Sequence, residues 1–381
     1  MKRTLYGSEH DAFRQSARDF LAKEVVPHFP RWEEAGLVPR EIFHKLGDLG
    51  VLGIQIPEEH GGGGADTFLY SAVWAEETAR AYVNLGGLSV HTNVVLPYFL
   101  SLADVQQRQR WFPGLACGDL MSAIAMTEPG TGSDLAGMAT TAVRDGEDWI
   151  LNGAKTFITG GIHADLVIVV ARTSTPENRR DGLTLLVVER AMDGFTRGRN
   201  LDKIGLKTQD TAELFFQDVR VPQANVLGEE GRAFRYLTGN LPQERLGIAV
   251  AAQAAAEAAL TTTTAYVKDR QVFGKPVAAF QNTKFELAAC ATDVAAGRAL
   301  VDKALVEHED KELSAADAAM VKLFCTEMQS RVIDRCLQLH GGYGYMREYP
   351  IARLYADARV TRIYGGTSEV LKTIIAKSID L

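Results

Sequence analysis

Residues 126–134 form the part of the sequence best suited to chemistry. The segment reads Met-Thr-Glu-Pro-Gly-Thr-Gly-Ser-Asp, so small residues and free backbone amides stand beside hydroxyls and two carboxylates. A tight loop of this kind can bring backbone donors close to a polar aromatic ring or a phosphate. A polar turn between two domains is the alternative interpretation of the same string.

Two acids and a histidine near glycines are tempting as further catalytic groups. We interpret Glu128 and Asp134 as loop-shaping residues, because an acid beside proline or after serine commonly accepts local backbone hydrogen bonds. For His340, which precedes two glycines, we favour a packing or capping role.

Four other strings accompany the first. They are Asn-Gly-Ala-Lys-Thr-Phe-Ile-Thr at 152–159, Arg-Gln-Val-Phe-Gly at 270–274 with Phe-Gln at 280–281, Gln-Leu-His-Gly-Gly-Tyr-Gly at 338–344, and Tyr-Gly-Gly-Thr-Ser-Glu at 364–369. In this order and at these separations, the five strings resemble the acyl-CoA dehydrogenase family of flavoenzymes. The resemblance runs from about Glu9 to the end of the chain.

The resemblance implies a mainly α fold with a central β-domain. We expect an N-terminal helical domain over 1–121, a middle β-sandwich or barrel over 122–226 and a C-terminal four-helix bundle over 227–381. It also implies a homotetramer built as a dimer of dimers. FAD would bind between the β-domain and the C-terminal helices, with its adenosine end reaching a neighbouring subunit.

Site residues carry over from the family position by position. Those expected along the flavin or beside the acyl-CoA pantetheine are Ile124, Met126, Thr127, Gly132, Ser133, Phe157, Ile158 and Thr159. Those expected on the pyrophosphate and adenosine side, or from the last loop, are Arg270, Phe273, Gln281, Gln338, Gly341, Gly342, Thr367 and Glu369. An arginine supplies bidentate phosphate recognition, and glycines permit close backbone approach, so these residue types suit the role.

Family chemistry is α,β-dehydrogenation of a saturated acyl-CoA thioester in fatty-acid β-oxidation. A carboxylate removes the α-proton while the β-hydride goes to flavin N5, and the electrons pass to an electron-transfer flavoprotein. In the commonest family pattern the base precedes the Gly-Thr of the last loop, but that position is Gly365 here. The string Leu-Pro-Gln-Glu-Arg-Leu at 241–246 instead resembles the long-chain type, which makes Glu244 the expected base.

The substrate contacts implied by the same strings are Ser133, Pro242, Gln243, Arg245, Gly365 and Gly366. The pattern also places Pro242 in the first turn of a helix, where the positive helix end and Arg245 would lower the pKa of Glu244. A desolvated acyl pocket would raise it. A surface glutamate paired with a basic residue is the alternative for Glu244, and a structural salt bridge is the alternative for Arg245.

Other functions remain compatible with the same fold. Related proteins act as acyl-CoA oxidases, on acyl-carrier-protein thioesters, or as desulfinases that lack a base; an expected base at Glu244 argues against the last. An alternative from another class is a flavin-free helical scaffold, which would bind neither FAD nor thioesters.

Composition narrows the class of protein. The chain has 381 residues, 46% hydrophobic and 23% charged, with 41 basic and 48 acidic residues, and this fits an acidic globular protein of two or three domains. Such a surface attracts neither nucleic acid nor anionic membrane, and no segment is long and apolar enough for membrane insertion. The cysteines and histidines show no metal-ligand spacing, and the four cysteines fit buried thiols. We expect a bacterial cytoplasmic protein, or a matrix protein if the source is mitochondrial.

The elements follow the order helical, β, helical. Apolar spacing predicts helices before residue 120, and β-type runs predict strands near 140–143, 149–151, 156–159, 166–171, 183–189 and 212–219. Asn152-Gly153 predicts a tight turn between two of them. Helices return after Pro222, and because long helices with short loops follow one another, a bundle is expected.

Overall fold

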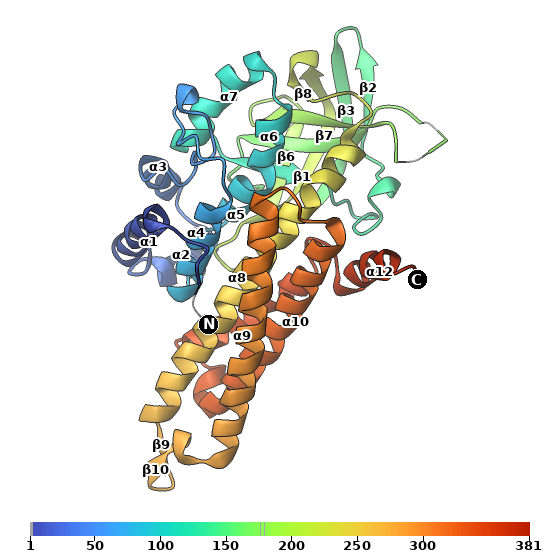
Figure 1. Ribbon diagram of the computed structural model, residues 1–381. Coiled ribbons are helices and arrows are strands. Elements are labelled where there is room, and N and C mark those ends of the chain that lie inside the picture. The colour runs from blue at the N-terminus through green and yellow to red at the C-terminus, as the bar shows by residue number, and fades with distance from the viewer. Residues whose placement is uncertain (1–2, 176, 179) are drawn as a thin grey trace.

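The computed structural model describes residues 3–175, 177–178 and 180–381. Its N-terminal part is a cluster of short helices that covers one side of a β-sheet (Figure 1). These helices are α1 (Ser8–Phe20), α2 (Phe29–Ala35), α3 (Arg40–Asp48), α4 (Leu69–Arg80), α5 (Leu88–Val90), α6 (Leu96–Leu102) and α7 (Val105–Cys117). Asp104 caps α7 by accepting a hydrogen bond from the Gln107 amide, which satisfies one of the free donors at that helix start.

Among the described residues, the middle part is one mostly antiparallel sheet of eight strands. The strands are β1 (Ser122–Ala125), β2 (Thr141–Asp145), β3 (Asp148–Thr159), β4 (Leu166–Arg172), β5 (Leu183–Glu189), β6 (Phe195–Asn200), β7 (Thr211–Pro222) and β8 (Val226–Leu227). Their order is β6-β7-β3-β2-β4-β5-β8, and β1 lies parallel to β4. The central strands β4 and β5 are buried on both faces, which explains their continuous runs of Val, Leu and Ile.

The C-terminal part is an elongated helical bundle that projects away from the sheet (Figure 1). It contains α8 (Ala233–Asp269), α9 (Gln281–Glu309), α10 (Ala315–His340), α11 (Pro350–Ala358) and α12 (Ser368–Ser378). A small hairpin of β9 (Gln271–Val272) and β10 (Lys275–Pro276) connects α8 to α9 at the far end of the bundle. Buried alanines along α8 let its neighbours approach closely, because small side chains permit close helix packing.

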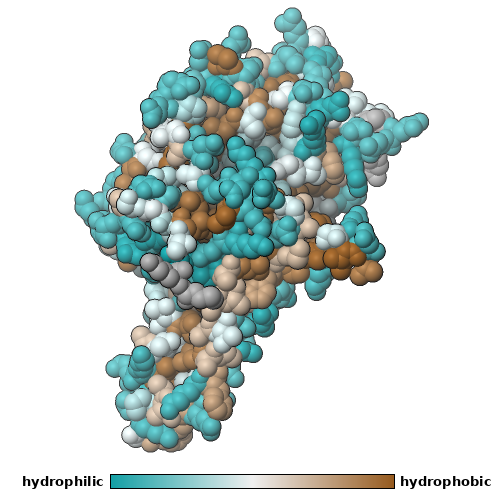
Figure 2. Space-filling model, in the orientation of Figure 1, coloured by the Kyte–Doolittle hydropathy of each residue, from teal (hydrophilic) through white to brown (hydrophobic). Residues whose placement is uncertain are grey.

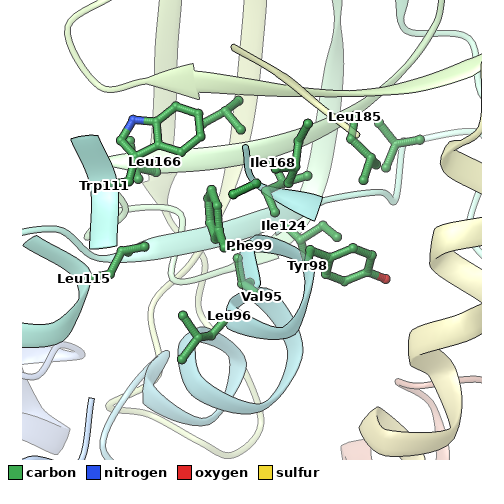
Figure 3. Packing of buried hydrophobic residues seen from close by; sticks show 14 of the residues in the cluster. Val95, Leu96, Tyr98, Phe99, Trp111, Leu115, Ile124, Leu166, Ile168 and Leu185 are labelled. Carbon is green, nitrogen blue, oxygen red and sulfur yellow. The ribbon is translucent and has the colours of Figure 1, made fainter. Parts of the chain in front are cut away.

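One apolar cluster joins all three parts near the sheet. Val95, Leu96 and Phe99 pack against Ile124 and other sheet residues in Figure 3, and the cluster continues to Leu237 on α8. The site described below lies where this cluster meets α8, so the core holds the site in place. Across the described residues, none of the helices has the length and apolar character needed to cross a membrane.

Three expectations from the sequence are wrong. Pro242 does not begin a helix, because α8 starts at Ala233 and runs through the proline. Proline removes one backbone hydrogen bond from this extra helical stretch. Burial of Ala233 and Leu237 stabilises the stretch and offsets that loss. Asn152-Gly153 is not a turn: β3 is continuous there, and Gly153 lies at a register shift beside Thr140. Finally, Cys117 is exposed, while the other cysteines are buried.

Candidate active site

Glu244 lies about three helical turns into α8. The first part of α8 is the part of that helix nearest the sheet (Figure 1). Its side chain is half-buried, and none of the described residues forms a hydrogen bond or ion pair with its carboxylate. The expected influence of a helix end is therefore wrong, since that effect fades within the first turn. Burial raises the pKa of Glu244, and nearby Arg245 and Lys322 oppose this rise. An unpaired carboxylate with a raised pKa suits a general base.

A glycine turn faces this carboxylate. Gly365 and Gly366 both have left-handed backbone conformations, with φ of +62° and +94°. A Cβ placed on Gly365 would lie 3.5 Å from Oε1 of Glu244 and would overlap Cδ1 of Ile248. Glycine is therefore needed at position 365 for both its backbone conformation and the close approach of α8.

Two buried cations hold the turn. Lys322 on α10 donates from Nζ to the carbonyls of Tyr364 and Gly366, each at 2.6 Å. Arg245 donates from Nε to the carbonyl of Gly365 at 3.4 Å. Arg245 has no carboxylate within ion-pair distance among the described residues, so the salt-bridge alternative for it is not supported.

The N-terminal part also reaches the site. Tyr98 of α6 is buried, and its hydroxyl points toward α8 in Figure 3. Burial raises the pKa of Tyr98, the charge of Glu244 adds to this, and a hydrogen bond with Asn240 opposes it. The tyrosine therefore remains a neutral hydroxyl beside the carboxylate.

Hydrogen bonds to Glu128 hold the base of the loop 126–134. The Glu128 carboxylate accepts hydrogen bonds from the amides of Ala139 at 2.6 Å and Thr140 at 2.9 Å, and from Nζ of Lys155 at 2.9 Å. Burial would raise the pKa of Glu128, but these donors outweigh it and hold the pKa below its ordinary value. The loop-shaping interpretation of Glu128 is confirmed. The tip is open, because a Cβ on Gly130 or Gly132 would meet no atom within 4 Å.

Phe157 projects from the end of β3 beside this loop. The register of β3 against β7 shifts between Lys155 and Ile158, so Phe157 leaves the hydrogen-bonded ladder with a φ of +58°. The ring is 68% exposed although it is aromatic. Strain of this kind persists where the surroundings fix it and often marks a functional surface.

A second group of predicted cofactor residues lies at the other end of the bundle. Arg270 and Phe273 lie at the β9–β10 hairpin, and Gln338 to Gly342 end α10 close to that hairpin (Figure 1). The Arg270 guanidinium stacks on Tyr343 at 5.2 Å from the ring centroid. Phe273 is 96% exposed, and Gln281 is exposed nearby. One copy of the chain therefore does not bring these residues together with Glu244 and loop 126–134.

Several predicted residues have additional structural roles. Thr367 caps α12 by accepting a hydrogen bond from the Val370 amide, and Glu369 in the first turn is exposed. Ile124 and Ile158 are buried and hold β1 and β3 in place. Gln243 donates to the Asn93 carbonyl at 3.2 Å and so joins α8 to the N-terminal part.

Lys322, Tyr98 and Asn240 were not predicted from the sequence. The signal for Lys322 was present, because it shares a helix face with Ala318, Cys325 and Gln329, all of which are buried. A lone lysine on such a face must be neutralised or hydrogen-bonded. No comparable signal marks Tyr98, whose partners come from a distant part of the sequence.

The two separate groups of residues fit the two ends of a dinucleotide cofactor. Loop 126–134 and Phe157 offer amides and an aromatic face for a flat ring system. At the other end, Arg270 offers a cation with no carboxylate partner among the described residues, and a Cβ on Gly341 or Gly342 would meet no atom within 4 Å. Open glycine backbone beside an arginine suits a pyrophosphate. FAD has both features.

Fold and site together describe a mainly helical protein with a half-buried carboxylate beside a surface that suits a dinucleotide cofactor. Three family models match the chain: acyl-CoA dehydrogenase N-terminal domain over residues 7–119, middle domain over 123–219 and C-terminal domain over 231–379. The chain is 50% identical to long-chain specific acyl-CoA dehydrogenase of Sus scrofa mitochondria, over 99% of this chain and 88% of that protein. It is 40% identical to an acyl-CoA dehydrogenase of Bacillus subtilis, over 97% of each.

Solved structures agree with these matches. An acyl-CoA dehydrogenase from Geobacillus kaustophilus shares 49% identity and a TM-score of 0.98 over 100% of both chains. A glutaryl-CoA dehydrogenase from Mycobacterium smegmatis, solved with FADH2, shares 29% identity and a TM-score of 0.90 over 99% of this chain and 95% of that one. The protein belongs to the acyl-CoA dehydrogenase family and resembles its long-chain type. It is an oxidoreductase of a family that depends on FAD and acts in fatty-acid β-oxidation.

Proposed function

We propose that the protein converts a saturated acyl-CoA to the trans-2-enoyl-CoA, with Glu244 removing the α-proton. The observation that carries the proposal is the Glu244 carboxylate itself, which is half-buried, has no hydrogen-bond partner among the described residues and faces the glycine turn at 365–366. A carboxylate with a raised pKa can accept a proton from a weakly acidic carbon near neutral pH. The alternative of a paired surface glutamate has no support, because neither Arg245 nor Lys322 bonds to it.

The neighbouring residues would orient the thioester for this proton transfer. The carbonyls of Gly365 and Gly366 accept hydrogen bonds from Arg245 and Lys322. A thioester oxygen would need hydrogen-bond donors, and free amides of this turn could supply them. Pro242, Gln243 and Arg245 line the same stretch of α8, and Ser133 lies at the open tip of loop 126–134.

FAD, when bound, would accept the β-hydride at N5. Met126, Thr127, Gly132, Phe157 and Thr159 would hold its ring system. Arg270, Phe273, Gln281, Gln338, Gly341 and Gly342 would hold the pyrophosphate and adenosine end of a cofactor bound mainly to a neighbouring subunit. Thr367 and Glu369 would contact it from the start of α12.

We also propose assembly as a homotetramer, a dimer of dimers, and this division of the site supports contact between at least two copies. Exposed apolar residues support it: Phe273 at the hairpin and Tyr345 after α10 are 96% and 84% exposed. Figure 2 shows a further hydrophobic surface near α12, where Ile379 and Leu381 are exposed. Surfaces of this kind on a folded chain commonly mark interfaces.

The proposed electron acceptor is an electron-transfer flavoprotein, and the proposed substrates are long-chain acyl-CoAs, as the names of the mitochondrial relatives suggest. The proposed compartment is the bacterial cytoplasm or, for a eukaryotic source, the mitochondrial matrix. An oxidase or a carrier-protein-specific enzyme would keep the same fold. Reaction of the reduced flavin with oxygen separates an oxidase from a dehydrogenase.

The test is anaerobic bleaching of the visible flavin band by acyl-CoAs that range from short to long and branched. We expect rapid bleaching by one class. Glu244→Gln should keep FAD and acyl-CoA binding but slow flavin reduction by roughly 10²- to 10⁴-fold, the usual contribution of a general base. The matched control is Glu257→Gln on the same helix, which removes an ion pair to Arg298 and should leave the reduction rate near wild type. Near-normal reduction in Glu244→Gln would remove Glu244 from the mechanism.

A further inference from the structure

Lys322 is a lysine in an unusual place. Its side chain is fully buried on α10 among apolar residues such as Cys325. A buried ammonium is unfavourable unless its donors are satisfied. The ammonium of Lys322 donates two hydrogen bonds of 2.6 Å to the backbone carbonyls on either side of Gly365, rather than to a carboxylate.

Three consecutive carbonyls of the turn point at cations. Lys322 binds those of Tyr364 and Gly366, and Arg245 binds the one between them. The left-handed conformations of both glycines make this arrangement possible. Hydrogen bonds from side chains of α10 and α8 therefore hold the turn in place. They also hold the orientation of its backbone amides.

The same lysine lies beside the proposed base. The position of a Cβ on Gly365 is 3.5 Å from Oε1 of Glu244 and 3.7 Å from Cε of Lys322, so the two side chains flank one glycine. We infer that Lys322 is a positioning residue, which fastens the Tyr364–Gly366 turn against Glu244 and supplies part of the positive charge that faces this carboxylate. The inference rests on the proposed role of Glu244.

The groups facing Glu244 come from four elements: Arg245 on α8, Lys322 on α10, Tyr98 on α6 and Tyr364 in the turn. Both tyrosines have pKa values raised by burial and are neutral, so Arg245 and Lys322 are the charged neighbours. Burial lowers the pKa of Lys322 to about 8, while Glu244 opposes this change. An opposite charge favours the ionised carboxylate, so removing the ammonium should raise the pKa of Glu244.

The test measures the pH dependence of anaerobic flavin reduction in the FAD-loaded enzyme. In Lys322→Met, which removes both the charge and the donors, we expect the reduction rate at neutral pH to fall about tenfold or more and the acid-side midpoint to rise by about one pH unit. Lys322→Gln removes the charge but keeps an N–H donor. The acid-side midpoint of Lys322→Gln should rise as much as that of Lys322→Met. At high pH its flavin reduction should be slowed less than that of Lys322→Met.

The control is Gln329→Leu, seven residues further along α10. This change removes the acceptor of a hydrogen bond from Thr361, so it disturbs the packing of the same helix without changing a charge. It should lower the melting temperature and leave the midpoint unchanged. If both Lys322 variants lose melting temperature but keep the wild-type midpoint, Lys322 is only structural and the inference is wrong. If Lys322→Met does not fold, the acid-side midpoint of Lys322→Gln alone tests the inference: a raised midpoint supports it, and a wild-type midpoint contradicts it.

Failure of this inference is distinct from failure of the proposed function. Near-normal flavin reduction in Glu244→Gln contradicts the role of Glu244 whatever Lys322 does. Slow reduction in Glu244→Gln combined with an unmoved midpoint in both Lys322 variants contradicts only the role of Lys322.

Discussion

The two ends of the helical bundle carry different kinds of site. Near the sheet, Glu244 lies among elements from the N-terminal and C-terminal parts of the chain, and buried side chains such as Lys322 hold its surroundings. At the far end, Arg270 and Phe273 are exposed, and the guanidinium contacts only an aromatic ring among the described residues. The side chains around Glu244 are buried or half-buried within one chain, whereas the second end presents exposed groups. Under the proposed function, a single chain would supply the base and one part of the cofactor-binding surface.

The first prediction concerns the near end and has the largest expected effect. In a Glu244→Gln background, Gly365→Glu would place a carboxylate at the position that the commonest family pattern uses. We expect little recovery of flavin reduction, which should stay roughly 100-fold or more below wild type, because the left-handed backbone strains any side chain and Cδ1 of Ile248 occupies the space.

Adding Ile248→Ala to this double variant should improve reduction, since it removes the overlapping atom. The measurement is the rate of anaerobic flavin reduction by a saturating acyl-CoA. Strong recovery without the Ile248 change would show that the turn is more adaptable than its fastening by Lys322 and Arg245 implies.

The second prediction concerns what holds the near end to the N-terminal part. Glu76 on α4 is buried and pairs with Arg3 at 2.9 Å, Arg14 at 2.9 Å and Arg298 at 3.0 Å. Glu76→Gln removes the buried carboxylate that these three guanidinium groups share, while each of them keeps another carboxylate partner, on Asp302, Glu77 and Glu257 respectively. The change should lower the free energy of unfolding by about 1.5–3 kcal/mol, the usual contribution of a hydrogen bond to a charged group. Glu24→Gln, which breaks more exposed pairs with Lys45 and Lys23, should cost no more than about 1 kcal/mol. Denaturant unfolding at pH 7 measures both.

The pH dependence of this stability has a definite sign. Burial would raise the pKa of Glu76, but Arg298, Arg3 and Arg14 outweigh it and hold the pKa below its ordinary value of 4.5. The stabilisation is therefore complete above pH 4.5 and is lost as the pH falls through the lowered pKa. The Glu76→Gln variant should lose less stability than wild type on acidification. Equal losses would mean that other carboxylates control the acid unfolding.

Much of this architecture could be predicted from the sequence, because its signals are local. The loop at 126–134, the Glu244 helix and the order of helical and β parts depend on residue types and short-range periodicity. Pro242 shows the limit, since burial of Ala233 and Leu237 extends α8 across a residue that locally favours a helix start. The role of Lys322 depends on carbonyls 42 and 44 positions away, which no local pattern reveals.

The third prediction concerns the far end and has the smallest expected effect. Arg270→Gln should weaken FAD binding roughly tenfold, because one hydrogen bond to a charged group contributes about 1.5–3 kcal/mol and part of it survives in the amide. The stability of the FAD-free chain should not change, since Arg270 is exposed and its guanidinium lies over the ring of Tyr343. FAD titration followed by flavin fluorescence, with melting of the FAD-free chain, measures both quantities. A loss of FAD-free stability with unchanged FAD affinity would make Arg270 a structural residue, and the two ends of the bundle would then not share a cofactor.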